Sequence, residues 1–355
     1  MSGAVPRLRP AVVRMRPYRP PLEGRRGSLR LDFNENAAGA SPAAVRALAS
    51  LDAQALAMYP EYGAARSRIA RGFGVSPREV VLTDGTDDAI HLAVDAFAGP
   101  GDEVLIVEPT YAMYRFYAER AGARVRAVRC PPGLSFPLER VLAALRRRPK
   151  LLFLANPNSP TGAVVAPDGL RRVLRASPRT AVFVDEAYFE FCGVSALGWI
   201  RRQPNLLVSR TFSKAYGLAG LRLGCLFASA RLAAALSRLH SPYSVSTAAL
   251  AAALAALRDA RATRRYADEV REARGRLEAA LDRLGIRRFP SGGNFVLVDV
   301  GRRADRMVAA LARRGILVRA RRADFARAGF VRITVGTLPQ TLRLIGALEN
   351  LWERA

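Results

Sequence analysis

One lysine in this sequence has surroundings that suit covalent chemistry. Lysine and arginine together number 56, yet only Lys150 and Lys214 are lysines. Arginine keeps its proton in a protein, whereas a desolvated lysine amine can attack a carbonyl group. Lys150 follows three arginines and a proline, which is typical of a surface position. Lys214 lies between two hydroxyl residues and a glycine-rich segment, and we predict that it performs Schiff-base chemistry.

Residues on both sides of Lys214 could bind a phosphate group. Thr211 and Ser213 precede the lysine, and Arg222 follows it by eight residues. Two hydroxyls and a guanidinium suit a phosphate dianion, which arginine binds in a forked geometry.

A second candidate for phosphate binding follows an apolar segment near residue 80. Gly85, Thr86 and Asp87 stand where a strand pattern changes to a helix pattern. A glycine at such a turn lets backbone N–H groups at the helix N-terminus converge on a phosphate. Helix capping by these residues explains the same pattern equally well.

A carboxylate ends one of the most apolar segments. Asp185 follows Ala181–Val184, where an unpaired charge would be costly. It could keep a ring nitrogen protonated, because an opposite charge favours the charged form. Tyr188, one turn later, and Asn158, in a turn with two prolines and a glycine, could each contact a phenolate oxygen. Helix capping and a plain β-turn are the alternatives for Asp185 and Asn158.

Taken in order along the chain, these groups match the needs of one cofactor. They supply a lysine for an aldehyde, an aspartate for a pyridine nitrogen, partners for a phenolate oxygen and two phosphate anchors. Pyridoxal phosphate carries all of these groups, and a lysine with an acidic partner for the ring nitrogen is its recognised motif. We therefore predict a pyridoxal-phosphate enzyme without a metal.

The chain resembles the fold-type I aminotransferases of the aspartate aminotransferase superfamily, and within them the histidinol-phosphate aminotransferases. The resemblance extends from about residue 31 to beyond residue 336. Its motifs are Leu31–Asn36, Tyr59-Pro60, Gly85–Asp87, Pro109–Tyr111, Asp185–Tyr188, Thr211–Gly224 and Val331–Thr337. Two positions depart from the family pattern: Ser159 replaces an asparagine and Ala37 replaces a proline.

The resemblance implies a role for each matched residue. The residues expected to bind the cofactor are Gly85, Thr86, Asp87, Tyr111, Asn158, Asp185, Tyr188, Thr211, Ser213, Lys214 and Arg222. Lys214, Asp185 and Tyr188 are expected to be catalytic, and Tyr111 to stack on the ring. Tyr59 is expected to reach the cofactor phosphate of a partner subunit, which implies a homodimer with shared sites. The expected substrate contacts are Asn36, Asn294, Arg319 and Arg332.

The implied reaction transfers the amino group of histidinol phosphate to 2-oxoglutarate, giving imidazole acetol phosphate and glutamate. An aromatic amino-acid aminotransferase and a threonine-phosphate decarboxylase of cobalamin synthesis would use the same cofactor residues, so both remain alternatives. A nucleic-acid-binding protein built on an inactive transferase fold is a third alternative, from a different class.

These residues require a scaffold of strands and helices in alternation. Between residues 79 and 228, apolar segments rich in β-formers alternate with amphipathic helical patterns. This pattern predicts a mostly parallel sheet covered by helices on both faces, with ligands at the carboxyl ends of its strands. Long helical patterns follow from about 247 to 284, with a break near Asp259, and then a second, smaller α/β pattern.

We therefore predict an aspartate-aminotransferase-like α/β fold in three parts. Residues 1–40 form an N-terminal arm, residues 41–245 a large cofactor-binding domain, and residues 246–355 a small domain against which the arm packs. A length of 355 residues is consistent with more than one core.

Composition narrows the classes of partner. The net charge of +26 comes from arginines spread over the whole chain, which indicates a compositional bias rather than a nucleic-acid site. No apolar segment approaches the roughly 20 residues that span a bilayer, and no signal peptide is apparent. Three dispersed cysteines and two histidines lack the spacing of a metal site. We predict a cytoplasmic protein without a nucleic-acid or membrane partner.

Overall fold

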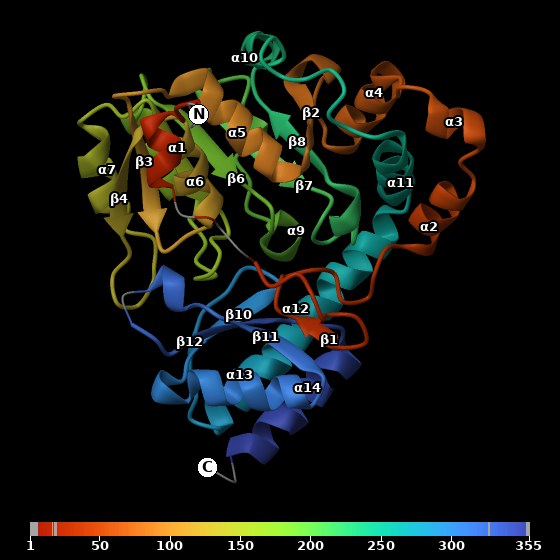
Figure 1. Cartoon of the computed structure of the whole chain (residues 1–355), viewed down its shortest axis with the longest axis vertical. Coiled ribbons are helices and arrows are strands. Elements are labelled where there is room, and N and C mark those ends of the chain that lie inside the picture. The colour runs from red at the N-terminus through yellow and green to blue at the C-terminus, as the bar shows by residue number, and fades with distance from the viewer. Residues whose placement is uncertain (1–5, 16, 18–19, 326, 353–355) are drawn as a thin grey trace, which may run out of the picture.

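The computed structural model describes residues 6–15, 17, 20–325 and 327–352. Two α/β units make up the described part of the molecule, as Figure 1 shows. The larger unit is built on a sheet of seven strands. In spatial order these are β2 (Val80–Asp84), β8 (Leu223–Phe227), β7 (Leu206–Thr211), β6 (Ala181–Asp185), β5 (Leu151–Ala155), β3 (Glu103–Glu108) and β4 (Arg124–Arg129).

This sheet is mostly parallel, as the alternating pattern predicts. Only β8 runs antiparallel to its neighbours β2 and β7. Along β3, Leu105 and Val107 enter one apolar core while Val104 and Ile106 enter the other. Alternate side chains of a strand point to opposite faces, so both faces of the sheet are buried.

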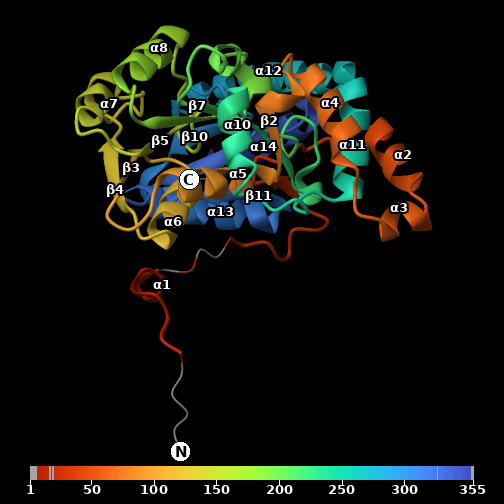
Figure 2. The ribbon, with the colours of Figure 1, turned by 90° about the horizontal axis from the view of Figure 1, so that it is seen from above.

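Helices cover each face of the large sheet. On one face lie α5 (Gly85–Phe97), α6 (Ala112–Arg120) and α10 (Ala230–Leu236). On the other lie α2 (Pro42–Ala49), α4 (Tyr62–Gly72), α7 (Leu138–Leu145), α8 (Pro167–Ala176) and α11 (Thr247–Arg258). The remaining short helices are α1 (Pro10–Arg14), α3 (Ala53–Ala57) and α9 (Phe189–Cys192). Figure 2 shows α1 on the arm that leaves the body of the molecule.

The smaller unit holds a sheet of five strands. Their order is β1 (Leu29–Leu31), β11 (Ile316–Ala320), β12 (Phe330–Thr334), β10 (Phe295–Asp299) and β9 (Arg287–Phe289). Packed with it are α12 (Ala260–Arg283), α13 (Ala304–Arg313) and α14 (Leu338–Trp352). Strand β1 belongs to the N-terminal segment and pairs in parallel with β11. The sequence predicts only an N-terminal arm over residues 1–40 and no strand within it, because three residues are too short for a periodic signal.

The chain passes from the core of the large unit to the core of the small unit at Asp259, between α11 and α12. Residues of α11 such as Ala249 and Ala253 belong to the core of the large sheet, whereas Val270 and Leu277 of α12 belong to the core of the small one. The core division therefore lies about a helix later than the expected boundary at residue 245. Asp259 breaks the helical pattern where predicted, and its side chain caps α12 by accepting from the amide of Ala262.

A second helix also begins at a side-chain cap. Ser41 caps α2 by accepting from the amide of Ala44, and Pro42 occupies the first turn. Within the described ranges, no helix is long and apolar enough to cross a membrane. The same ranges hold no group of three or more His, Cys, Asp or Glu side chains that could bind a metal.

Candidate active site

A cavity of about 270 Å³ lies beyond the carboxyl ends of β2, β6 and β7, where open α/β sheets bind ligands. The N-terminal segment forms another part of its wall. The residues that line it are Phe33, Glu35, Thr86, Asp87, Tyr111, Tyr114, Ala155, Pro157, Ser159, Asp185, Ala187, Tyr188, Thr211, Ser213, Lys214, Ala219 and Arg222. Most of the predicted cofactor residues therefore share one cavity.

Asp185 lies at the end of β6 and is held by three donors. The hydroxyl of Tyr114 donates to Oδ2 at 2.7 Å. The hydroxyl of Ser209 and the amide of Ala187 donate to Oδ1 at 2.9 and 3.2 Å. Burial raises the pKa of this carboxyl, although the hydrogen bonds oppose the rise. A protonated ring nitrogen would reverse the shift, because a buried carboxylate is stabilised by an opposite charge.

The turn after β2 brings the backbone close to Arg222. Gly85 adopts φ +70°, and a Cβ at this position would lie 2.3 Å from Nη2 of Arg222. The positive φ favours glycine at this position, and any side chain here would displace the guanidinium. Beside it, the buried hydroxyl of Thr86 has no hydrogen-bond partner among the described residues.

Arg222 itself is held loosely. Its Nη1 lies 3.5 Å from the hydroxyl of Ser213 and 3.2 Å from the carbonyl of Ala219, and its Nη2 lies 3.6 Å from Asp87. Asp87 also accepts from the hydroxyl of Tyr111 at 2.7 Å. A guanidinium with weak partners, beside an unpartnered hydroxyl at a helix N-terminus, fits a phosphate group.

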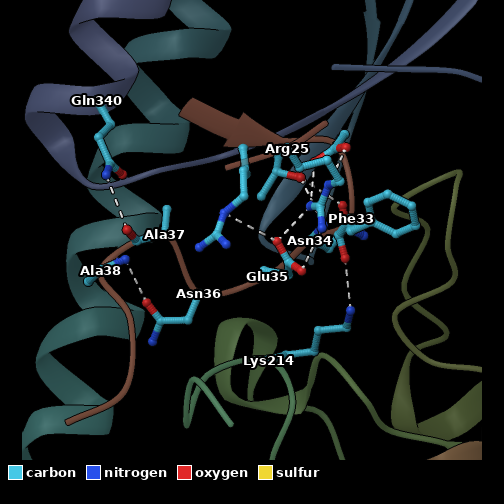
Figure 3. Close-up of polar contacts among 12 residues, drawn as sticks. Arg25, Phe33, Asn34, Glu35, Asn36, Ala37, Ala38, Lys214 and Gln340 are labelled. Atoms are coloured by element: carbon cyan, nitrogen blue, oxygen red, sulfur yellow. Dashed lines mark hydrogen bonds and ion pairs between the residues drawn. The ribbon is translucent and has the colours of Figure 1, made fainter. Parts of the chain in front are cut away.

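Lys214 approaches the N-terminal segment across the cavity. Its Nζ donates to the carbonyl of Phe33 at 2.9 Å, as Figure 3 shows, and lies 5.9 Å from the ring centroid of Tyr188. The hydroxyl of Tyr188 accepts from Nδ2 of Asn34 at 2.9 Å. Burial alone would raise the pKa of Tyr188, but the charges of Lys214 and Arg332 together with hydrogen bonds from Asn34 and Ser159 outweigh burial and lower it.

Arg332, on β12, is buried beside the cavity. Its Nη1 donates to the hydroxyl of Ser159 at 3.0 Å and its Nη2 to the carbonyl of Asp32 at 2.6 Å. Burial lowers the pKa of this guanidinium to about 10. Arg319 pairs with Arg332 across the two strands, and its guanidinium lies 5.3 Å from the ring centroid of Phe33. An anionic group is the natural partner for a desolvated guanidinium such as that of Arg332.

Asn158 does not line this cavity, whereas Ser159 does. The amide nitrogen of Asn158 donates to the carbonyl of Pro109 and to the hydroxyl of Thr161, both at 2.8 Å, and its oxygen accepts from Thr110 at 2.6 Å. These bonds hold the turn in place, so the polar group presented to the cavity from this turn belongs to Ser159.

Two of the expected substrate residues support the N-terminal segment. Asn36 donates to the carbonyl of Ala215, next to Lys214, and accepts from the amide of Ala38. Asn294 donates to the carbonyl of Asn34 at 3.1 Å. Neither side chain lines the cavity.

Tyr59 lies outside this cavity and is 76% exposed. Its ring is 4.7 Å from that of Tyr243. Its expected contact with a neighbouring subunit's cofactor stays a prediction.

The sequence analysis missed several residues of the site. Ser209 is two positions before Thr211 on β7, so the two-residue period of a strand could have indicated that both side chains lie on the same face of the sheet. Tyr114 is three positions after Tyr111, as residues on one face of a helix are. No local signal indicates that Phe33 or Glu35 would line the cavity, since their position depends on how the segment folds back.

Comparison with known proteins places the chain in a family. A family model described as "Aminotransferase class I and II" matches residues 26–348. The chain therefore belongs to the class I and II aminotransferase family.

Within that family, it is similar to proteins named histidinol-phosphate aminotransferase. One from Symbiobacterium thermophilum is 41% identical, covering 96% of this chain and 98% of the relative. One from Pseudomonas aeruginosa is 35% identical and covers 99% of each chain.

Solved structures agree with these relatives. The histidinol-phosphate aminotransferase from Sinorhizobium meliloti, in complex with pyridoxal-5'-phosphate, superposes with a TM-score of 0.90 at 26% identity over 99% of each chain. A double mutant of the aspartate aminotransferase from Thermus thermophilus gives a TM-score of 0.84 at 27% identity, over 98% of this chain and 100% of that one. The predicted aspartate-aminotransferase-like fold and the predicted family are confirmed.

Proposed function

We propose that this protein is a pyridoxal-phosphate-dependent aminotransferase that moves the amino group of histidinol phosphate to 2-oxoglutarate. The observation that carries the proposal is one cavity that joins Lys214, the buried carboxylate of Asp185 and the phosphate-fitting end at Thr86 and Arg222. The names of the relatives support the choice of amino donor.

The residues present fit this cofactor at both of its ends. The hydroxyls of Thr86 and Ser213 and the guanidinium of Arg222 would hold its phosphate, and Asp185 would hold the proton on its ring nitrogen. Ser159 or Tyr188 would contact its phenolate oxygen. When bound, pyridoxal phosphate supplies an aldehyde for amine exchange and a ring that withdraws electrons from the substrate.

Each remaining task falls to the chain's own side chains. Lys214 would hold the cofactor and, once the substrate amine takes its place, would move the proton at the substrate's α carbon. Tyr114 and Ser209 orient the carboxylate of Asp185. Arg332 would bind the anionic end of the substrate, exchanging its bonds to Ser159 and to the carbonyl of Asp32 for bonds to the ligand.

A panel of amino donors tests the reaction. Histidinol phosphate, aromatic amino acids, aspartate and threonine phosphate are each assayed with 2-oxoglutarate, and both glutamate and carbon dioxide are measured. We expect histidinol phosphate to give the highest kcat/KM for glutamate. A higher kcat/KM with aromatic amino acids would indicate an aromatic amino-acid aminotransferase instead. Release of carbon dioxide from threonine phosphate would indicate a threonine-phosphate decarboxylase.

We further propose a homodimer with shared sites. Large apolar side chains that are exposed in the single chain include Val45, Leu56, Met58, Tyr59 and Tyr243, on and near α2 and α3. The rings of Tyr59 and Tyr243 lie side by side, and exposed apolar side chains that gather in one region are typical of an interface. Mixing Tyr59→Phe chains with Lys214→Ala chains should then restore part of the lost activity, whereas a fully active monomer in sedimentation would contradict the proposal.

The remaining expectations stay predictions with tests of their own. Fractionation of the cells tests the cytoplasmic location. A salt-dependent shift of DNA by the purified protein would contradict the expectation that nucleic acid is not a partner, because phosphate contacts make such binding sensitive to salt.

A further inference from the structure

Arg25, in the N-terminal segment just before β1, forms a double clamp on two carboxylates. Its Nε and Nη2 donate to Asp32 at 3.0 and 2.8 Å, and its Nη1 and Nη2 donate to Glu35 at 3.1 and 2.7 Å. Its side chain is only 12% exposed, and its guanidinium lies 4.4 Å from the ring centroid of Phe33. The three charged residues therefore form one compact unit inside the segment.

The clamped segment also contacts the reactive amine. The carbonyl of Phe33 accepts from Nζ of Lys214 at 2.9 Å. Glu35 lines the same cavity as Lys214. Figure 3 shows Lys214 approaching the segment from one side and Arg25 from the other, with Glu35 reaching toward Arg25. A carboxylate thus stands close to a lysine that must react as a neutral amine.

An unneutralised carboxylate in this place would oppose the chemistry. A carboxylate that pairs with a lysine stabilises the ammonium form, which is not a nucleophile. Burial alone would raise the pKa of Glu35, but hydrogen bonds and charge from Arg25 lower it. The charges of Arg30, whose Nε lies 3.8 Å from Glu35, and of Lys214 also lower this pKa, so the carboxyl is ionised. Burial would lower the pKa of Arg25, but its bonds to Asp32 and Glu35 raise it, so the clamp stays charged.

The other charged groups of the cavity already have partners. Asp185 is held by Tyr114 and Ser209, and Asp87 by Tyr111 and Arg222. Among the described residues that line the cavity, Glu35 is the remaining carboxylate. The further ionisable lining groups are Tyr111, Tyr114, Tyr188, Lys214 and Arg222.

We propose that Arg25 is a positioning residue for Lys214, because it holds the carboxylate of Glu35 away from the amine and leaves the carbonyl of Phe33 as the amine's partner. This inference rests on the proposed function, in which Lys214 is the nucleophile. Arg25 is 189 positions from Lys214 in the sequence and lies in a part of the chain where the sequence analysis expected only an irregular arm.

The test follows the reactivity of the amine in the full chain without added cofactor. Trace acetylation with acetic anhydride is measured by peptide mapping at a series of pH values, and Lys150, the other lysine of the sequence, serves as the internal reference. In Arg25→Ala we expect the curve of Lys214 acetylation against pH to shift to higher pH by about one unit. This is the lower end of the effect of a nearby opposite charge. The profile of Lys150 should not move.

A second substitution separates electrostatics from simple anchoring. In Arg25→Ala/Glu35→Gln the free carboxylate is gone, so the profile of Lys214 should return to that of the wild type. Arg25→Lys keeps the charge but not the paired hydrogen bonds to both carboxylates. It should therefore shift the acetylation curve of Lys214 to higher pH by a smaller amount. The matched control is Arg288→Ala, which removes a similar two-bond pair with Asp282 on the small unit and should leave the profile unchanged.

Specific outcomes overturn the inference. An unchanged profile in Arg25→Ala, or a shifted profile that Glu35→Gln does not restore, would show that Arg25 only fastens the segment. If Arg25→Ala does not fold, an unshifted profile in Arg25→Lys overturns it instead. These results can be distinguished from a failure of the proposed function, which fails if the wild-type chain binds no pyridoxal phosphate at Lys214.

Discussion

The site has two halves that are built in different ways. The strand-end half comes from the large sheet, and four of its residues, Asp185, Thr211, Ser213 and Lys214, lie within 30 positions of one another. The segment half joins Arg332 to the carbonyl of Asp32, which is 300 positions away, and to Ser159, which is 173 away. The strand-end half follows from the ends of neighbouring strands. The segment half forms only when residues far apart in the sequence come together in the fold.

The two arginines of these halves also differ in how they are held. Arg222 is 43% exposed on its side chain, and its polar neighbours lie between 3.2 and 3.6 Å away. Arg332 is buried and makes bonds of 2.6 and 3.0 Å. An anion can therefore join Arg222 without displacing a strong partner. At Arg332 both terminal nitrogens are already bonded, and only the buried Nε has no hydrogen-bond partner among the described residues. The comparison indicates a preformed cofactor end and a substrate end that exchanges partners.

The largest effect is expected in the strand-end half. Lys214→Arg keeps a positive charge but cannot act as an amine, so kcat should fall by a factor of about 10² to 10⁴ or more. Lys150→Arg is the matched control and should keep full activity. Borohydride reduction of the wild type with pyridoxal phosphate, followed by peptide mapping, checks the attachment; label on Lys150, or none at all, would contradict the assignment.

The next effect tests the segment half. Arg332→Ala should lower kcat/KM for the phosphorylated donor and for 2-oxoglutarate together, since both half-reactions use one site. The expected loss is about 2–5 kcal/mol if the substrate anion is buried against the guanidinium. Steady-state kinetics with both substrates measure it. Unchanged constants would remove Arg332 from the substrate site and leave the comparison of the two arginines without a functional meaning.

A third prediction concerns the buried carboxyl of Glu190, close in sequence to Asp185 of the strand-end half. Glu190 faces Arg210, which is bonded to Glu186 at 2.7 Å, and burial raises the pKa of Glu190 to about 7. The folded protein therefore binds a proton more tightly than the unfolded chain between about pH 4.5 and 7. Its stability should fall as pH rises through that window, by at most about 3 kcal/mol from this group.

Glu190→Gln should remove that loss. Denaturant unfolding of the variant and of the wild type at pH 5, 6, 7 and 8 measures the difference in the free energy of unfolding. The advantage of Glu190→Gln should grow as pH rises, whereas the exposed Glu119→Gln should follow the wild type. A constant difference across the series would contradict a raised pKa at Glu190.

The smallest effect is expected at Thr86. Its buried hydroxyl has no hydrogen-bond partner among the described residues, so Thr86→Val should not lower the free energy of unfolding. The same change should weaken binding of pyridoxal phosphate by about 1 kcal/mol, the value of one hydrogen bond. Absorbance titration of the cofactor-free protein measures this, and Thr86→Ser should retain the affinity. Equal affinity in Thr86→Val would remove the hydroxyl from the phosphate site.

The sequence by itself determined the sheet, the helices and the strand-end half. Continuous apolar strands such as Ala181–Val184 must be buried on both faces, and polar residues at their carboxyl ends must then meet at one edge of the sheet. Lys214 could be singled out because its chemistry cannot be performed by the arginines that replace lysine elsewhere. For these residues, local pattern and side-chain chemistry were sufficient.

The tertiary structure decided how the segment half is assembled. The family motif at Leu31–Asn36 and the match at Arg332 predicted substrate contacts, but no local pattern indicates that Arg25 or Glu35 would meet Lys214. The reason is that β1 is only three residues long and its pairing with β11 spans most of the chain. Whether Asn158 or Ser159 faces the cavity likewise depended on which side chain the turn used for its own hydrogen bonds. Contacts between distant segments depend on packing, and packing is not encoded in any local period of the sequence.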